Sequence, residues 1–208
     1  MNRNSYGPLT LSPTAAGAGT VSASASPAAG AIVIDGTAAS GGVATLGSAQ
    51  LITLVSGGND SGLTFTITGT DSDNRAQTEA VTGASGGTAT STKYFKTVTS
   101  IAHTGSVAGT LSAGCTIDSV SNTISPNLEV PFCQIGIGVQ LVSGTSTYKV
   151  QHSYQDGRSS HPTVWFDNSA GAKSASSEAT YATPVATIRI LLSASSSAVI
   201  SANILQAG

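Results

Sequence analysis

Residues 63–101 read LTFTITGTDSDNRAQTEAVTGASGGTATSTKYFKTVTSI, and they decide the fold class. The segment opens with alternating apolar and hydroxyl side chains over 63–68, the period of a strand with one buried face. A polar turn follows at 69–75, and the chain returns toward a second apolar run at 93–101. Turn residues between two runs of strand-forming residues indicate antiparallel pairing. We therefore expect an all-β protein.

The same plan recurs in residues 147–190, TYKVQHSYQDGRSSHPTVWFDNSAGAKSASSEATYATPVATIRI. The turn residue Asp71 has a counterpart in Asp156, at an offset of 85. Further matches, at an offset of 87, are Tyr94 with Tyr181, Val98 with Val185 and Ile101 with Ile188. The recurrence predicts two small antiparallel β-sandwich or barrel-like modules related by internal duplication. The alternative is unrelated strands that share a composition rich in Ser, Thr, Ala and Gly.

The expected organisation has four parts. Residues 1–31 are rich in Ser, Ala, Gly and Pro, and we expect an extended N-terminal arm that is disordered or laid along a neighbouring subunit. A first β-module over 32–118 is followed by a linker at 119–131, where two prolines stiffen the chain. A second β-module occupies 132–208.

Two local features refine the expected strands. Val98 and Ile101 are both apolar but three positions apart, which breaks the period of two and predicts a bulge or bend. The pairs Gly57-Gly58 and Gly86-Gly87 are not followed by a helix, as a phosphate-binding loop would be. We interpret them as flexible loops.

Charge and hydropathy limit the classes of partner. Only 9% of the residues are charged, while 39% are hydrophobic and 59 are Ser or Thr, with a net charge of −2. A surface so poor in charge is weakly protected against association, and this favours burial in an assembly as a homo-oligomer. The eight scattered Lys and Arg form no basic patch for nucleic acid. No apolar run approaches the ~20 residues of a membrane span, and the N-terminus lacks the apolar core of a signal peptide.

No constellation of residues predicts catalysis. The histidines lie far apart in the sequence, without the spacing of a metal-ligand pair, and we interpret them as ordinary hydrogen-bonded residues. They are His103, His152 and His161. No G-x-S-x-G motif marks a nucleophile among the many serines. We therefore predict no catalytic, cofactor-binding or metal-binding residues, no cofactor, and a protein that is not an enzyme.

The acidic cluster of Asp71, Asp73 and Asn74 partly resembles a calcium-binding loop. An EF-hand-type site needs more oxygen ligands and a terminal Glu at fixed spacing, which are absent. Asp and Asn also form tight turns, because their side chains accept hydrogen bonds from nearby backbone amides. The turn interpretation is the preferred one.

The two cysteines, Cys115 and Cys133, have no neighbouring Cys or His that would complete a zinc site. Synthesis in a cytosol favours free, buried thiols. A disulfide formed after release from the cell is the alternative.

The aromatic pair Trp165-Phe166 allows two interpretations. A core pair in the second module is favoured. The alternative is an exposed contact for a host glycan or a protein, to which Tyr154 would also contribute.

The chain resembles small virion structural proteins of tailed bacteriophages. The segments that carry the resemblance are MNRNSYGPLTL (1–11), GNDSGLTFTITGTD (58–71), YFKTVTSI (94–101), TYKVQHSYQD (147–156), TVWFDNS (163–169), TPVATIRI (183–190) and LQAG (205–208). These are strand and turn motifs, and the family carries no active-site residues to transfer.

The resemblance implies a multi-copy protein that is made in the host cytoplasm and built into the virion. The expected function is capsid decoration, in which a cement protein binds and stabilises the shell of the major capsid protein. The alternatives are a structural protein of the tail or the head–tail connector, and a module that binds a host glycan or receptor.

Overall fold

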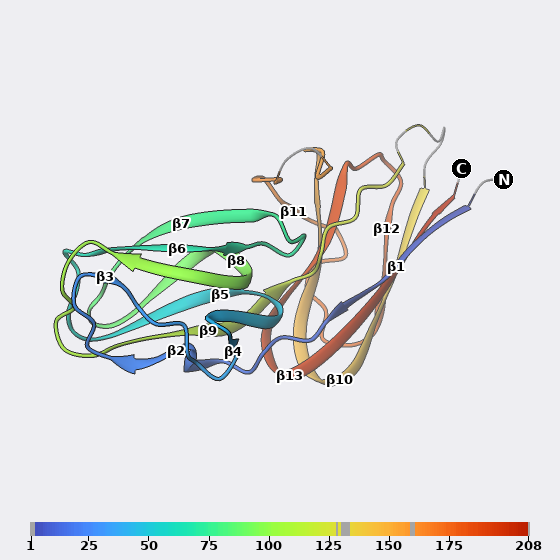
Figure 1. The fold of residues 1–208 in the computed structure, drawn as a ribbon. Helices are drawn as coiled ribbons and strands as arrows, with labels where there is room; N and C mark the ends of the chain where they lie inside the picture. The colour runs from blue at the N-terminus through green and yellow to red at the C-terminus, as the bar shows by residue number, and fades with distance from the viewer. Residues whose placement is uncertain (1–2, 128, 130–133, 159–160, 208) are drawn as a thin grey trace. The chain divides into compact units, whose positions relative to one another are not determined.

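The computed structural model describes residues 3–127, 129, 134–158 and 161–207 (Figure 1). Within these ranges every regular element is a β-strand and no helix forms, so the prediction of an all-β fold is confirmed. No helix that could span a membrane is therefore present in the described part. The abundance of Thr, Val and Ile, which pack well on pleated surfaces, accounts for this class.

The chain folds into two compact units. The first unit is Pro13–Ser119, and the second unit combines Met1–Ser12 with Val120–Gly208. The division after residue 119 falls at the start of the segment 119–131, the expected linker. The sequence gives no sign that the N-terminal residues belong to the second unit, because the whole first unit separates them from it.

The first unit is an antiparallel sheet with the strand order β9-β5-β8-β6-β7. Three further strands pair with it, β2 on β9, β3 on β8 and β4 on β5. Its strands are β2 (Gly17–Ala25), β3 (Gly30–Ala31), β4 (Ala39–Ser40), β5 (Val43–Asn59), β6 (Thr64–Thr70), β7 (Ala76–Thr82), β8 (Ser85–His103) and β9 (Leu111–Val120). On β6 the expected alternation is confirmed, since Phe65 and Ile67 are fully buried while Thr64 and Thr66 are exposed.

The bulge predicted from the spacing of Val98 and Ile101 is present on β8. The pairing of β6 with β8 shifts by one residue between Thr68 and Gly69, and the extra residue on β8 is Thr99. This insertion turns both Val98 and Ile101 into the core, where each is fully buried.

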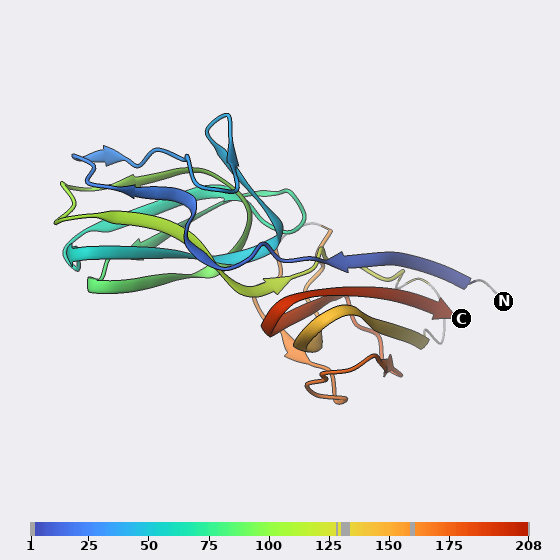
Figure 2. The same ribbon diagram turned by 90° about the horizontal axis from the view of Figure 1, so that it is seen from below.

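The second unit is organised around a long antiparallel pair formed by β10 and β13. Its strands are β1 (Arg3–Leu11), β10 (Gln134–Ser153), β11 (Phe166–Asp167), β12 (Ser177–Tyr181) and β13 (Thr187–Ala207). Register shifts between Leu141 and Thr147 bend the pair near its middle, and Figure 2 shows the resulting curvature of both strands. Residues from both halves, among them Ile137 and Val150, share one core. The unit is therefore sandwich-like, and the described strands do not close into a barrel.

The strand pairing supports the internal duplication. In the first unit β6 lies between β7 and β8, and in the second unit the end of β10 lies between β11 and β13. The equivalent pairs are Thr66↔Ala80 with Gln151↔Asp167, Thr66↔Ala102 with Gln151↔Arg189, and Ile67↔Ile101 with His152↔Ile188. The middle strands correspond at an offset of 85 and their neighbours at 87, as in the sequence. The strand register of the first unit and that of the second unit therefore both agree with the alignment made from the sequence.

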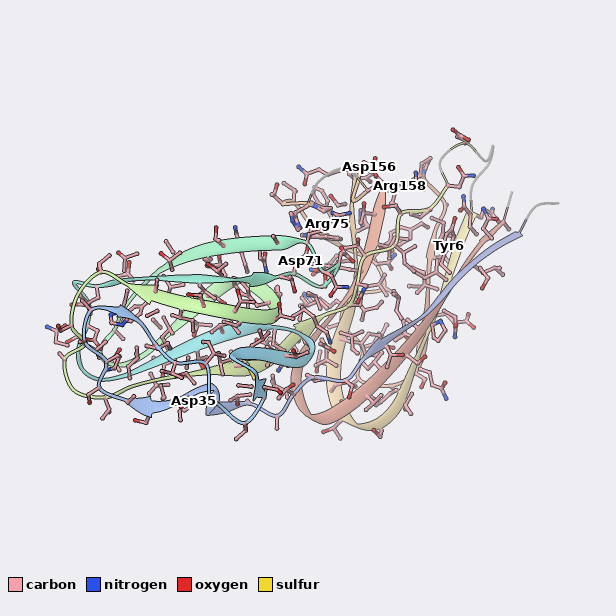
Figure 3. The ribbon with its side chains drawn as sticks, in the orientation of Figure 1. Tyr6, Asp35, Asp71, Arg75, Asp156 and Arg158 are labelled. Atoms are coloured by element: carbon pink, nitrogen blue, oxygen red, sulfur yellow. The ribbon has the colours of Figure 1, made fainter. Side chains whose placement is uncertain are left out.

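The turns that follow the two middle strands also correspond (Figure 3). The Asp71 carboxylate accepts a hydrogen bond from the amide of Asp73 at 2.9 Å, and Asp156 accepts one from the amide of Arg158 at 2.9 Å. In the first turn Asn74 adopts a positive φ of 61°, which Asn tolerates. The turn interpretation of this acidic cluster is confirmed.

The segment 1–31 is extended, as expected, but its described part from residue 3 onward pairs within the chain rather than on a neighbouring subunit. β1 pairs with β13, β2 with β9 and β3 with β8. Proline does not prevent this, because Pro8 lies at a register shift between Tyr6 and Leu9, where the hydrogen-bond ladder is already interrupted. The expectation of disorder or of an external partner for this segment is therefore corrected.

Two buried glutamines fix the N-terminal segment. Gln206 is 1% exposed, and its Oε1 accepts a hydrogen bond from the Tyr6 hydroxyl at 3.1 Å. Gln50 is fully buried, and its side-chain amide accepts from the Thr14 amide and donates to the Thr14 carbonyl, both at 2.8 Å. Buried amides are stabilising only when they find partners, so each glutamine favours the docked segment over a free one.

The two glycine pairs lie in strands, so the interpretation as flexible loops is wrong. Gly58 is in β5, and a Cβ there would lie 1.8 Å from the carbonyl oxygen of Ala108. Gly86 and Gly87 begin β8 with φ values of 61° and 142°, which other residues rarely adopt. Gly58 is needed because another part of the backbone approaches it closely, and Gly86 and Gly87 are needed because their φ angles are positive.

Part of the expected linker also packs along a strand. The backbone of Ser121 donates to the carbonyl of Ile190, and that of Ile124 forms a bridge with Ile188. Residues 128, 130 and 131 of the linker lie outside the described residues.

Replacing Leu11 tests the docking of β1. Leu11 is fully buried in the core of the second unit, so we expect Leu11→Ala to lower the free energy of unfolding by about 2–5 kcal/mol in urea denaturation. The control is Leu205→Ala on β13, where the side chain is 47% exposed and the expected change is within about 0.5 kcal/mol. Equal effects of the two changes would contradict the placement of β1.

Candidate functional site: an aromatic patch on the second unit

Four aromatic rings gather where β10 ends beside β11. His152 stacks on Phe166 with ring centroids 5.7 Å apart, and Tyr154 meets the edge of His152 at 5.4 Å. Tyr181, from β12, also makes an edge contact with His152, with ring centroids 5.0 Å apart. We call His152, Tyr154, Phe166 and Tyr181 the aromatic patch. Such edge-to-face and stacked arrangements each contribute about 0.5–1.5 kcal/mol beyond burial.

The patch is open to solvent on one side. Tyr154 is 63% exposed and Phe166 46%, and the neighbouring Val164 is also exposed. These are three of the six large hydrophobic side chains that stand out as exposed in the described part of the chain. A gathering of exposed apolar side chains is a more informative signal than scattered ones.

The prediction of Trp165-Phe166 as a core pair is wrong. Phe166 lies opposite His152 on the two-residue strand β11, which pairs with β10 at the edge of the sheet, so its ring stays exposed. Trp165 is half-buried and stacks against Arg189, whose guanidinium carbon lies 3.9 Å from the ring centroid. Both aromatic residues are at the surface, as the alternative interpretation required.

Hydrogen bonds hold the loop that carries the Trp165 ring. The side-chain oxygen of Gln155 accepts from the amides of Thr163 and Val164 at 2.6 and 3.1 Å. The indole N–H of Trp165 donates to the carbonyl of Pro162 at 3.1 Å. These contacts close the loop after β10 on itself and fix the position of the ring.

A row of polar side chains crosses the same strands on the opposite face of the sheet from the patch. Arg189 Nε donates to Gln151 Oε1 at 2.9 Å, and Gln151 Nε2 donates to Asp167 Oδ1 at 2.9 Å. Lys149 Nζ forms an ion pair with Asp167 Oδ2 at 2.6 Å. Directly opposed residues on neighbouring strands produce this polar row, because the register places Gln151 between the other two partners.

The environment sets the charges at the site. Burial lowers the pKa of His152 from its ordinary value, and burial raises the pKa of Tyr181 to about 12. The hydrogen bond from Lys149, followed by the one from Gln151, lowers the pKa of the Asp167 carboxyl. At neutral pH His152 and Tyr181 are therefore uncharged, and the polar row on the opposite face of the sheet contains an ionised carboxylate.

Two polar atoms inside the patch lack a partner in the described part of the protein. They are the Nδ1 atom of His152 and the hydroxyl of Tyr181, which is 7% exposed.

The remaining sequence candidates lie elsewhere. His103 packs on Phe65 at 5.8 Å and its Nδ1 lies 2.7 Å from the Gly105 carbonyl oxygen, an ordinary hydrogen-bonded position. His161 is exposed on the loop after β10. Among the described residues no three His, Cys, Asp or Glu side chains gather as metal ligands would.

Cys115 is a free thiol buried in the core of the first unit, and burial raises its pKa. Its sulfur lies 3.6 Å from Gln50 Nε2 and 3.8 Å from the Ala15 carbonyl oxygen. Cys133 lies outside the described residues, so the state of this second thiol stays a prediction.

A hollow lies toward the other end of β10 from the aromatic patch. It is shallow and open, with a volume of about 380 Å³, and is lined by Gly138, Val139, Gln140, Ser176, Ser177, Glu178 and Asn203. It carries no aromatic ring and no ionisable group other than Glu178, and therefore offers less chemistry than the aromatic patch.

The chain matches no family model, and no curated protein is significantly similar to it. The function must therefore be argued from the residues and from the fold.

The lowered pKa of His152 makes the second unit sensitive to acid. The unfolded chain binds a proton at this position near pH 6.5, whereas the folded protein does so only at lower pH, so stability falls as the pH drops below 6.5. We expect the His152 ring signals in NMR spectra to titrate with a midpoint below 6.5. We also expect His152→Ile to lose less stability between pH 7.5 and 5 than the original protein. A midpoint at or above 6.5 would contradict the burial of this ring.

Proposed function

We propose that the chain is a structural protein of a bacteriophage virion, a decoration protein that binds the shell of the major capsid protein in many copies and stabilises it. It acts by adhesion rather than by catalysis, and it is assembled into the particle in the host cytoplasm. The observation that carries the proposal is the duplicated β-unit. One chain presents the same arrangement of three paired strand segments twice, as suits a protein that bridges repeated subunits of a shell.

The composition of the surface supports adhesion. With charged residues at 9% and a net charge of −2, little electrostatic repulsion opposes the approach of other subunits or of further copies of the chain. Specific contacts typically bury about 1,600 Å² in total, and buried apolar area contributes about 25 cal/mol per Å² before the cost of association is subtracted. Each contact can be weak, because simultaneous attachment through two units supplies avidity.

The outer strands of each unit are available for such contacts. β7 is an edge of the first unit, and its side chains are mostly exposed. β12 pairs only with β10 in the described part of the second unit. Edge strands add a further strand from a partner through backbone hydrogen bonds. This mode suits a partner that is another virion protein or a second copy of the chain.

Position in the particle distinguishes this proposal from the alternative, a structural protein of the tail or the head–tail connector. Electron micrographs of particles carrying an epitope-tagged chain, labelled with antibody, measure that position. We expect label over the whole capsid surface. Label confined to the tail vertex would favour the alternative, and absence of the chain from purified particles would reject a virion protein altogether.

Loss of the protein should weaken the shell. Particles assembled without the chain should release their DNA at a lower temperature than complete particles, measured by a DNA-binding dye during heating. Adding back the purified chain should restore the release temperature, whereas an unrelated β-protein of similar size should not. An unchanged release temperature without the chain would contradict a stabilising role.

A further inference from the structure

Two glycines on β10 leave open space on one face of the second unit. Gly136 and Gly138 lie two positions apart on the strand, so both stand on the same face of the sheet. The residues that alternate with them, Ile135, Ile137 and Val139, are buried in the core on the opposite face. A Cβ atom at either glycine would meet nothing within 4 Å, and neither glycine has a positive φ. Neither internal packing nor backbone conformation therefore requires glycine here.

The other reasons for a glycine inside a strand can be tested in turn. Such a glycine marks a bulge, a tight bend, or a place where another backbone or a ligand approaches closely. The pairing of β10 with β12 and with β13 is regular at both glycines, and the first register shift comes after Leu141. No described backbone of the chain itself approaches the open side of either glycine. Approach by a group from outside the chain is the reason that remains.

Polar side chains stand on both sides of Gly138. The register places Glu178 of β12 directly opposite Gly138 on one side and Asn203 of β13 directly opposite on the other. Gln140 follows two positions along β10, and all four residues therefore share one face of the sheet. The three side chains are exposed, and the described part of the protein gives none of them a hydrogen bond or an ion pair. Because neighbouring strands lie about 4.8 Å apart, the backbones that carry Glu178 and Asn203 are about 10 Å apart across the glycine.

The hollow of about 380 Å³ lies at this place, and Gly138, Gln140, Glu178 and Asn203 are among the residues that line it. Its volume is at the lower end of the range for ligand sites, about 300–1,000 Å³. Among the described lining residues Glu178 is the only one with an ionisable side chain, and none is aromatic. The hollow therefore suits a small cationic group with several hydrogen-bond donors.

The geometry points to a guanidinium group, and we propose that the hollow receives the side chain of an arginine carried by a partner polypeptide. A guanidinium is planar and carries five N–H donors. The Glu178 carboxylate accepts two of them in parallel, and the amide oxygens of Gln140 and Asn203 accept others. The methylene stem of the arginine lies over the bare backbone at Gly138. The inference concerns this hollow alone and does not depend on the virion proposal.

Other occupants match the hollow less well. A lysine ammonium presents three donors at one point, whereas a guanidinium spreads five over a plane and reaches acceptors that stand apart. A phosphate group is repelled by the Glu178 carboxylate. A second copy of the chain docked through the same hollow would bring two Glu178 carboxylates together. A saccharide would find hydrogen-bonding groups but no aromatic ring for its apolar face among the described lining residues.

A short arginine peptide is the direct probe. A blocked pentapeptide with a central arginine between valines and threonines is titrated into the isotope-labelled full chain, and the backbone amide signals of Gly136 and Gly138 are followed by NMR. Matched peptides replace the arginine by lysine or by citrulline, which has the shape of arginine without its charge. We expect saturable shifts with a Kd of about 10 mM or lower for the arginine peptide, and binding at least about tenfold weaker for the citrulline peptide.

Matched variants locate the binding. Gly138→Thr places a side chain in the hollow, and Glu178→Gln removes the charge while keeping the shape, so each should weaken binding of the arginine peptide at least about tenfold. Gly138→Thr should keep or raise the thermal unfolding temperature, because threonine favours strands and the space above the glycine is open. The control is Gly62→Thr in the first unit, another glycine with open space around it, which should bind as the original protein does.

Three results would overturn the proposal. One is the absence of shifts at Gly136 and Gly138 with the arginine peptide up to about 50 mM. Another is equal binding of the citrulline peptide, which would remove the role of charge. The third is tighter binding of a neutral trisaccharide, titrated in the same way, which would assign the hollow to a saccharide. Loss of arginine binding in Gly138→Thr, with normal binding in Gly62→Thr, supports the arginine site whether or not the chain is a virion protein.

Discussion

Both units depend on long antiparallel strand pairs that can bury only one face. Because successive side chains alternate between the two faces, such a pair needs something to cover its apolar side. In the second unit β10 and β13 bend at the register shifts between Leu141 and Thr147. Each half of the bent pair then covers the apolar face of the other half, and the two halves share one core. Every other element, including the N-terminal strand β1, is placed by its pairing with these two strands.

The same constraint explains how much of the fold the sequence predicts. Where the period of two is unbroken, as at Phe65 and Ile67, the strand and its buried face follow from the residues alone. A single break, at Val98 and Ile101, even predicts the bulge at Thr99. The tight turns at Asp71 and Asp156 can be predicted because an Asp carboxylate accepts a hydrogen bond from the backbone amide two residues further on. These two turns occupy equivalent positions in the alignment of the two units.

Other features depend on contacts between distant residues and could not be predicted. The docking of residues 3–31 relies on Gln50 and Gln206, whose partners lie far away along the chain. The glycine pair at Gly57-Gly58 indicates a loop locally, but it permits close approach of the segment at Ala108. The exposure of Phe166 depends on β11 being only two residues long. Neither composition nor periodicity contains that information.

The duplication also separates the fold from the candidate site. Residues shared by the two units maintain the sheets, whereas the polar row and the rings of His152, Tyr154 and Phe166 belong to the second unit alone.

The equivalence of the two units in register is the central claim, and nuclear Overhauser contacts between opposed backbone protons test it most directly. The account predicts cross-strand contacts of Thr66 with Ala80 and Ala102, and of Gln151 with Asp167 and Arg189. A slip of one residue in either unit would place the opposite face of a strand toward the core. Contacts displaced by one residue in one unit would contradict the duplication and remove the basis for comparing the two units.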